Sequence, residues 1–316
     1  MSNHFHELQR LCKKSKLWFC IETTAKFFTV LVVITACAHL PVSVAQGTTP
    51  PPNQSSNEAW YVLMGVDSNP PAAALDPKIA GISVRVSWSQ IEPEDDQWDW
   101  SYLDQVFDWA EYQDKLVMLR VMAGTLAPAH SYDKQVANIP TPWEPRHQAE
   151  YAELMQVLAA RYGLRSELRL VHVSGFWNSA EFHVPRKIED DPRMADAFIE
   201  RLKATAYAFP AQRISLNHSP ESFSQAVISA AQQLFPNQIT FQMNALKADI
   251  NTSWPGYTTI RDLGLEGWDI GWQFVGPSIN DKRFGGPFQQ AVDIGRLGNP
   301  KYWEIYAPDV PLISNP

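Results

Sequence analysis

The stretch LRLVHVSGFWNSAEFHVP, residues 168–185, joins a short apolar run to a polar and aromatic group. The run Leu168–Val173 is typical of a buried strand, and Ser174 and Gly175 end it. The group that follows contains Trp177, Asn178, Glu181 and His183. In a parallel α/β barrel, functional side chains lie on the loops that leave the C-terminal ends of the strands, so an acid, an amide and an indole there favour a sugar site. The alternative is a helix N-terminus, where Glu and Ser are common.

The same alternation of short apolar runs with amphipathic segments continues along the chain from Trp60. Such alternation predicts a parallel sheet, and eight strands are the number that closes a barrel. The sixth crossover, around Thr258–Leu263, has room for one or two helical turns, and Pro70 and Pro71 leave the first crossover only a short helix. We therefore predict a single-domain α/β fold, a (β/α)8 TIM barrel. Its predicted strands are residues 60–66, 82–88, 116–122, 168–173, 213–216, 239–243, 268–273 and 302–305.

The first 45 residues have the composition of an export signal. Basic residues precede an apolar segment, Phe27–Ala38, that is too short to span a bilayer comfortably. We expect residues 1–45 to be a signal peptide cleaved after Ala45, residues 46–57 to be a flexible linker, and residues 58–316 to form the barrel domain. The expected mature protein is exported and has no membrane span. Processing as a lipoprotein through Cys37 and an uncleaved anchor are the alternatives.

Composition excludes several classes of function. All three cysteines lie in the leader, so the expected mature chain has no disulfide or thiolate. Removing the leader's net charge of +3 from the whole-chain charge of −8 leaves about −11, which argues against nucleic acid as a partner. His130, His183 and His218 lie on three separate predicted loops, and no P-loop or dinucleotide fingerprint is present. We therefore expect no metal and no cofactor.

The run VRVSWSQIEPEDDQWDWSYLD, residues 84–104, resembles clan A glycoside hydrolases of the β-galactosidase-like and cellulase-like kind. The resemblance implies a (β/α)8 barrel with an acid/base Glu at the end of strand four and a nucleophile Glu at the end of strand seven. Glu181 matches the first of these, although two residues separate it from Asn178, where the clan usually has Asn directly before Glu. Gln273 stands at the second position, and an amide cannot form a glycosyl ester. Glu304, in the eighth strand, is the remaining candidate.

We predict Glu181 and Glu304 as the catalytic pair, and the sequence leaves retention and inversion of the anomeric configuration open. The alternative for Glu304 is a buried acid paired with Arg85 or Arg120. Indoles suit the C–H faces of sugars, whereas amides and imidazoles suit hydroxyls, with packing and loop capping as the alternatives. Trp143 and Trp254, in crossover loops, add to the indoles near one rim. The predicted substrate-binding residues are Trp88, Glu92, Trp177, Asn178, Asn217, His218, Gln242, Asn244, Trp272, Gln273 and Tyr306.

Together these features predict an exported glycoside hydrolase that cleaves O-glycosidic bonds in an oligo- or polysaccharide by a two-carboxylate mechanism. Two other functions are compatible with the sequence. A catalytically inactive, carbohydrate-binding barrel would explain Gln273 at the seventh strand, and an envelope-tethered lipoprotein would use Cys37.

Overall fold

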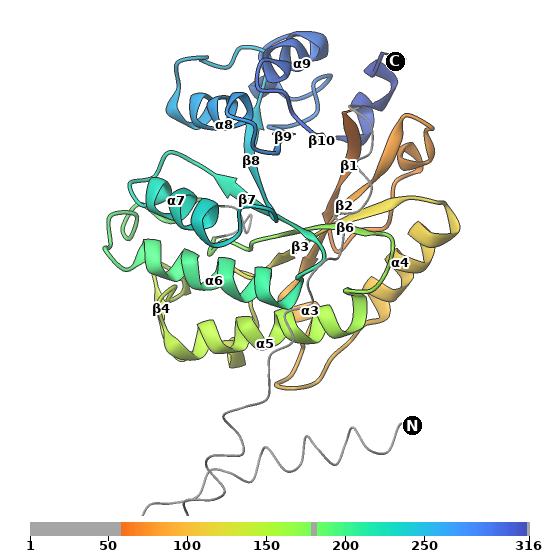
Figure 1. Ribbon diagram of the computed structural model, residues 1–316. Helices are drawn as coiled ribbons and strands as arrows, with labels where there is room; N and C mark the ends of the chain where they lie inside the picture. The colour runs from red at the N-terminus through yellow and green to blue at the C-terminus, as the bar shows by residue number, and fades with distance from the viewer. Residues whose placement is uncertain (1–57, 178–181, 315–316) are drawn as a thin grey trace, which may run out of the picture. The chain divides into compact units, whose positions relative to one another are not determined.

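The computed structural model describes residues 58–177 and 182–314. Eight parallel strands form a closed barrel in the order β1-β10-β9-β8-β7-β6-β3-β2 (Figure 1). The described residues form one compact unit. The predicted (β/α)8 TIM barrel is therefore confirmed. The barrel strands are β1 (Ala59–Val66), β2 (Ile79–Ser87), β3 (Leu116–Met122), β6 (Leu168–His172), β7 (Arg213–His218), β8 (Ile239–Leu246), β9 (Ile270–Phe274) and β10 (Tyr302–Ile305).

Helices follow the barrel strands, and α5, α6 and α7 lie side by side along one flank (Figure 1). The α-helices are α3 (Trp88–Ile91), α4 (Ser101–Tyr112), α5 (Pro145–Tyr162), α6 (Met194–Ala208), α7 (Ser224–Leu234), α8 (Pro255–Leu265) and α9 (Phe288–Arg296). The short 3-10 turns are η2 (Ala72–Leu75), η3 (Ala129–Ser131), η4 (Lys282–Phe284) and η5 (Ala307–Leu312). Strands β4 (Gln135–Val136) and β5 (Ile139–Pro140) form a small antiparallel pair in the loop before α5.

Most strand boundaries differ from the sequence prediction by one to three residues, and two differences change the local structure. Strand β2 ends at Ser87, because Trp88 already belongs to the short helix α3. The sixth crossover contains an 11-residue helix, α8, where one or two turns were predicted. Pro255 opens α8, a position that proline favours because its fixed φ suits a helix and its missing N–H has no partner to lose. The short helix predicted for the first crossover is present as η2.

The barrel interior has an apolar layer and, nearer the C-terminal ends of the strands, a polar layer. Tyr61, Met118, Leu170 and Tyr302 form an apolar cluster separate from the core that the strands share with the helices. Side chains alternate along a strand, so the residues two positions further along β3, β6 and β10 also point inward. Those residues are Arg120, His172 and Glu304, all fully or almost fully buried. Charged groups therefore lie in the middle of the barrel, on the side of the C-terminal ends of the strands.

The segment that leaves β6 is fixed by a second buried cation, Arg201 of α6. Its Nη1 donates to the carbonyls of Ser174 and Gly175, at 3.1 and 2.7 Å. Its Nη2 donates to the carbonyl of Ala123 at 3.2 Å and lies 2.6 Å from His147 Nε2. Burial lowers the pKa of Arg201 to about 9, so the guanidinium is still charged at neutral pH. This side chain positions the start of the loop that carries Trp177.

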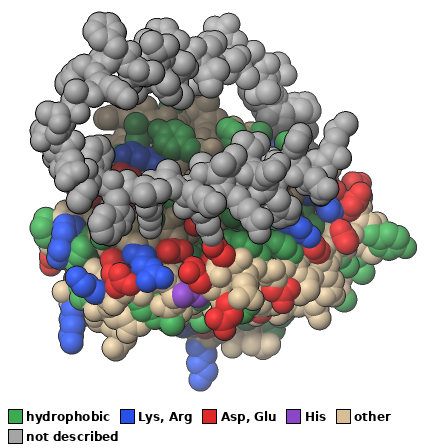
Figure 2. Space-filling view, turned by 90° about the horizontal axis from the view of Figure 1, so that it is seen from below, with side chains coloured by type: hydrophobic (Ala, Val, Ile, Leu, Met, Phe, Trp, Pro, Cys, Tyr) green, Lys and Arg blue, Asp and Glu red, His purple; other side chains and the backbone are tan. Residues whose placement is uncertain are grey.

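The surface carries charges of both signs. On the face shown in Figure 2, acidic side chains lie among lysines, arginines and apolar groups. Ion pairs such as Arg165 with Glu111, 3.1 Å apart, join neighbouring elements, and an exposed pair of this kind contributes about 0–1 kcal/mol. Within residues 58–177 and 182–314, no helix has the length and apolar character needed to cross a membrane.

Replacing Arg201 by methionine is expected to lower the free energy of unfolding by about 3 kcal/mol or more, because three buried carbonyls lose their donor. Equilibrium denaturation in urea measures the change. Lys203→Met, in the same helix, is the control, since Lys203 is partly exposed and forms a surface ion pair with Glu200. A control that destabilises as much as Arg201→Met would contradict the role of the buried hydrogen bonds.

Candidate active site

Glu304 lies at the centre of the polar layer, and both of its oxygens accept hydrogen bonds. Ser83 Oγ donates to Oε1 at 2.6 Å, and His172 Nε2 lies 3.1 Å from the same oxygen. Gln242 Nε2 donates to Oε2 at 2.8 Å, and Arg120 Nη2 donates to it at 3.2 Å. The carboxylate is fully buried. Three donors and a neighbouring imidazole, from four different strands, therefore surround one acid inside the barrel.

These donors keep the acid ionised. Burial by itself raises the pKa of Glu304, but the charge of Arg120 and the hydrogen bonds from His172 and Ser83 outweigh it and lower the pKa to about 2. Burial and Arg120 lower the pKa of His172 to about 4. Since Arg120 Nη2 lies 3.4 Å from His172 Nδ1, that nitrogen acts as an acceptor and the proton belongs on Nε2, facing Glu304. At neutral pH the site holds a carboxylate anion beside a neutral imidazole.

The network connects Glu304 to the strand on which a nucleophile was expected. Glu304 and Gln273 pair in register on β10 and β9, and Arg120 Nη1 donates to Gln273 Oε1 at 3.1 Å. The same guanidinium thus bonds the amide of β9 and the acid of β10. Of the two partners considered for a buried Glu304, Arg120 is the one present, whereas Arg85 Nε donates to the carbonyl of Met64 at 2.8 Å.

Gln242 extends the polar layer toward the rim. Its Oε1 accepts from Tyr302 at 2.5 Å, and its Nε2 also reaches Asn244 Oδ1 at 2.6 Å. Asn244 lies two residues further along β8 and lines a small cavity at the ends of β7 and β8. The buried network around Glu304 is therefore continuous with a cavity near the C-terminal ends of the strands. This cavity is lined by Phe182, His183, Asn217, His218, Ser219, Met243, Asn244, Ala245 and Trp254.

Two amides in this cavity have polar atoms that lack partners. Among the described residues, neither Oδ1 nor Nδ2 of Asn217 makes a hydrogen bond, and the same holds for Nδ2 of Asn244. Asn217 is only 3% exposed. A buried polar group without a partner costs about 1–3 kcal/mol, so such groups mark a place where water or a ligand completes the hydrogen bonds. With a volume of about 10 Å³, the cavity holds one group the size of a water molecule or a hydroxyl.

Trp254 and Ala245 line both this cavity and a larger one of about 540 Å³, which also includes Ile250 and Val275. The indole of Trp254 packs on Gly256, where an added Cβ would lie 2.4 Å from the ring. Glycine is thus needed at residue 256 for this placement of the ring. In the sequence, Trp254 is one of several indoles in crossover loops, and its position in the loop after the sixth strand is the signal that points to this role.

Two predicted substrate contacts lie away from the cavities, on the outside of the barrel. Trp88 is fully buried, stacks on His147 and donates from Nε1 to Glu92 Oε2 at 2.7 Å. Trp272 is also fully buried, stacks on Tyr257 of α8 and donates to a carbonyl of α9. Both indoles fill the layer between strands and helices, which is the packing alternative for these residues. The structure does not bring them to the barrel mouth.

The other predicted residues have varied positions. Trp177 is 38% exposed, and Tyr306 is half-buried directly before η5. His218 is buried, its Nδ1 lies 2.6 Å from Ser224 Oγ, and burial lowers its pKa to about 4. Asn178 and Glu181 lie outside the described residues, so the pairing of Glu181 with Glu304 stays a prediction. Glu92 is buried at the end of α3, in a separate group of side chains described below.

Comparison with known proteins agrees with this fold. Residues 78–205 match the glycoside hydrolase 42 family, described as Beta-galactosidase. The catalytic domain of the β-amylase from Paenibacillus polymyxa superposes with a TM-score of 0.56 and 10% identity, over 80% of this chain and 92% of that one. The intracellular xylanase of Thermoanaerobacterium saccharolyticum superposes with a TM-score of 0.53 and 13% sequence identity, over 83% of this chain and 90% of that one. No curated protein sequence matches the chain.

A family 10 endoxylanase from a sugarcane soil metagenome gives a TM-score of 0.52 at 13% identity, over 80% of this chain and 85% of that one. At such identities the structures show the fold alone. The family match covers the VRVSWSQIEPEDDQWDWSYLD run and extends past strand β6. The chain is therefore a (β/α)8 barrel of the kind found in glycoside hydrolases, and its resemblance to clan A glycoside hydrolases is confirmed.

Because of the buried acid and imidazole, we expect the free energy of unfolding to decrease as the pH is lowered. Glu304 has a folded pKa of about 2, below its ordinary value, so its contribution is present above pH 4.5 and is lost as the pH falls toward 2. His172 is neutral in the folded protein with a pKa of about 4, so stability falls from pH 6.5 to 4 as the unfolded chain takes up a proton. Each group contributes a slope of at most about 1.4 kcal/mol per pH unit.

Urea denaturation between pH 7 and pH 4 measures this slope. His172→Gln is expected to reduce the slope between pH 6.5 and 4 without abolishing it, because buried His147 and His218 also have lowered pKa values. Equal slopes for the wild type and His172→Gln would contradict the neutral, buried imidazole.

Proposed function

We propose that this protein is an exported glycoside hydrolase that cleaves O-glycosidic bonds in an oligo- or polysaccharide, with Glu181 and Glu304 as its two carboxylates. The observation that carries the proposal is an ionised acid, Glu304, held by three hydrogen-bond donors and the nearby imidazole of His172 inside a barrel of glycoside hydrolase type. The family match spans residues 78–205 and includes Glu181. Similarity to β-galactosidases thus extends over the segment that contains the predicted proton donor.

The two acids need opposite protonation states. A general acid must hold a proton when substrate arrives, whereas a nucleophile or general base must be ionised. The lowered pKa of Glu304, about 2, suits the second role. Phe176 and Trp177 precede Glu181 in sequence, and apolar neighbours of this kind would raise the pKa of a carboxyl by desolvation, as the first role requires. Ser83 and Gln242 would hold the Glu304 carboxylate in a fixed orientation toward the substrate.

The cavities at the ends of β7 and β8 favour a carbohydrate over an apolar ligand. Asn217 and Asn244 offer donors and an acceptor without partners among the described residues, which matches the paired donor and acceptor character of a sugar hydroxyl. Trp254 adds an indole wall beside them, suited to the C–H face of a pyranose ring. An apolar ligand would leave the amides unsatisfied.

A second function, a catalytically inactive carbohydrate-binding barrel, has an observation of its own in support. Glu304 is fully buried and paired with Arg120, and the residue beside it on β9 is the amide Gln273. A protein of this kind would keep the cavities at β7 and β8 while Glu304 served only to hold the strands together.

Kinetics of two variants test the catalytic roles. Glu181→Ala should keep appreciable activity on an activated aryl glycoside, because a good leaving group needs little protonation, and added azide should increase it in a retaining enzyme. Glu304→Gln should lose activity on activated and natural substrates alike by several orders of magnitude, since an amide cannot act as nucleophile or base. Glutamine is chosen at 304 because its amide has nearly the shape of the carboxylate and its oxygen can still accept a hydrogen bond from Arg120, whereas alanine would leave a cavity and no acceptor.

Glu266→Gln, which changes an exposed acid before β9, is the matched control and should resemble the wild type. Circular dichroism establishes that each variant is folded. Glycan binding by wild type and by Glu304→Gln, with no turnover by either on a panel of aryl glycosides and polysaccharides, would support the binding-only function. A folded Glu304→Gln with wild-type turnover would reject Glu304 as a catalytic residue.

Export is the part of the proposal that rests on the leader alone. Expression of the full chain in a Gram-negative host should give a mature form that begins at Gln46 in the periplasm or medium, which N-terminal sequencing detects. Metabolic labelling with a radioactive fatty acid distinguishes the lipoprotein route, with Cys37→Ser as its control. Label on the wild type but not on Cys37→Ser would favour the envelope-tethered form, and full-length protein in the cytoplasm would contradict export.

A further inference from the structure

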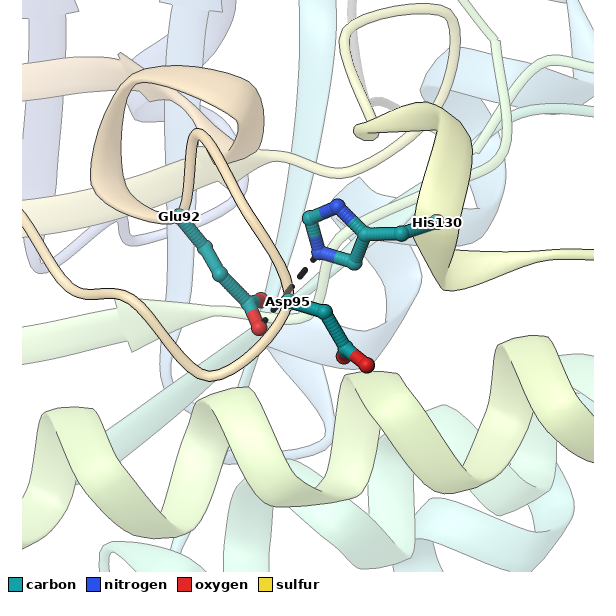
Figure 3. Close-up of side chains that lie close together, drawn as sticks. All are labelled: Glu92, Asp95 and His130. Atoms are coloured by element: carbon teal, nitrogen blue, oxygen red, sulfur yellow. Dashed lines mark ion pairs between the residues drawn. The ribbon is translucent and has the colours of Figure 1, made fainter.

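A second group of polar side chains lies where the loop after α3 meets the turn η3 (Figure 3). Glu92 ends α3, Asp95 follows in the next turn, and His130 belongs to η3. One ligand atom from each of the three side chains lies within 4.8 Å of the others. The three residues are therefore placed so that they could hold one metal ion.

The Glu92 carboxylate is already fixed in place. It is 3% exposed, and Trp88 Nε1 donates to its Oε2 at 2.7 Å. The backbone N–H of Asp96 donates to Oε1 at 3.2 Å. Hydrogen bonds of this kind hold the ligands of metal sites in orientation, so Trp88 would serve as a support for the ligand Glu92. The indole predicted from sequence to contact a sugar thus has a positioning role instead.

His130 supplies the observation that points to an ion. Its Nε2 is buried and makes no hydrogen bond with any described residue, and it lies 3.5 Å from Glu92 Oε1. This separation is long for a hydrogen bond. Two ligands at about 2.0–2.2 Å from a tetrahedral ion lie about 3.4 Å apart, which is close to the separation found here. An ion between the two atoms would give His130 Nε2 the partner that it lacks among the described residues.

The charges around the group favour a cation. Glu150 of α5 lies close enough to interact electrostatically with Glu92 and Asp95, which adds a third carboxylate. Arg146 is the nearby cation, and it pairs with Asp133 at 2.8 Å as well as with Glu150 at 3.6 Å. Asp95 is exposed, which leaves the group open to solvent and gives an ion a path of entry.

We propose that Glu92, Asp95 and His130 bind a divalent ion of the zinc type, with one oxygen from each carboxylate, Nε2 of the imidazole, and water in the fourth position. One imidazole with two carboxylates suits Zn²⁺ better than Ca²⁺ or Mg²⁺, which prefer oxygen ligands alone. The ion would join the loop before α4 to the loop before α5. This site is independent of the proposed glycosidase activity.

Isothermal titration of the EDTA-treated protein with ZnCl2 tests the proposal. We expect one ion per chain and a higher thermal unfolding midpoint in its presence, because a ligand that binds only the folded state stabilises it. His130→Ala and Asp95→Asn should each weaken binding at least tenfold. CaCl2 and MgCl2 should bind more weakly than ZnCl2.

His183→Ala is the matched control, since His183 pairs with Glu221 on another loop and could bind zinc weakly by itself. Its affinity should equal that of the wild type. Zinc binding that His130→Ala leaves intact, or that His183→Ala abolishes, would overturn the site. No binding to the wild type would also overturn it and would leave Glu92 and His130 as a simple ion pair.

Discussion

The ion pair between Arg120 and Glu304 is the interaction on which the barrel interior depends. Two buried charges cost several kcal/mol of desolvation each, and the cost is offset only where further hydrogen bonds satisfy them. Here the bonds come from Ser83, His172 and Gln242, with Gln273 on the other side of the guanidinium. These six side chains belong to β2, β3, β6, β8, β9 and β10. The pair therefore fixes most of the barrel strands relative to one another.

The same bonds determine what Glu304 can do chemically. An acid buried among apolar side chains would be neutral, whereas the donors around Glu304 stabilise its anion and lower its pKa to about 2. Pairing with Arg120 and service as a nucleophile or base are therefore compatible, since both need the ionised form. Whether this barrel is an enzyme or a binding protein then depends on two things: access of the substrate to one oxygen of Glu304, and the presence of a proton donor opposite it.

The fold could be predicted from sequence because strand and helix periods are local, whereas much of the site could not. Strands of a parallel barrel are buried on both faces, so an apolar run does not reveal which side chains point inward. Trp88 and Trp272 were assigned to the mouth but pack against helices. His172, in the apolar run LRLVHV, was not recognised as a partner of Glu304, although a polar residue in such a run is a signal of a buried network.

The WSQIEP run, part of the stretch that resembles clan A glycoside hydrolases, stabilises a loop in a way that its sequence alone does not reveal. Trp88 and Glu92 are four residues apart, so the turn of α3 places them on one face, where the indole N–H donates to the carboxylate. This bond buries the acid beneath the rim and directs its other oxygen toward His130. The WSQIEP run thus anchors the loop after β2, and its indole contributes to the barrel by packing. Resemblance in this run indicates a shared barrel architecture, while the sugar chemistry has to be argued from β7, β8 and β10.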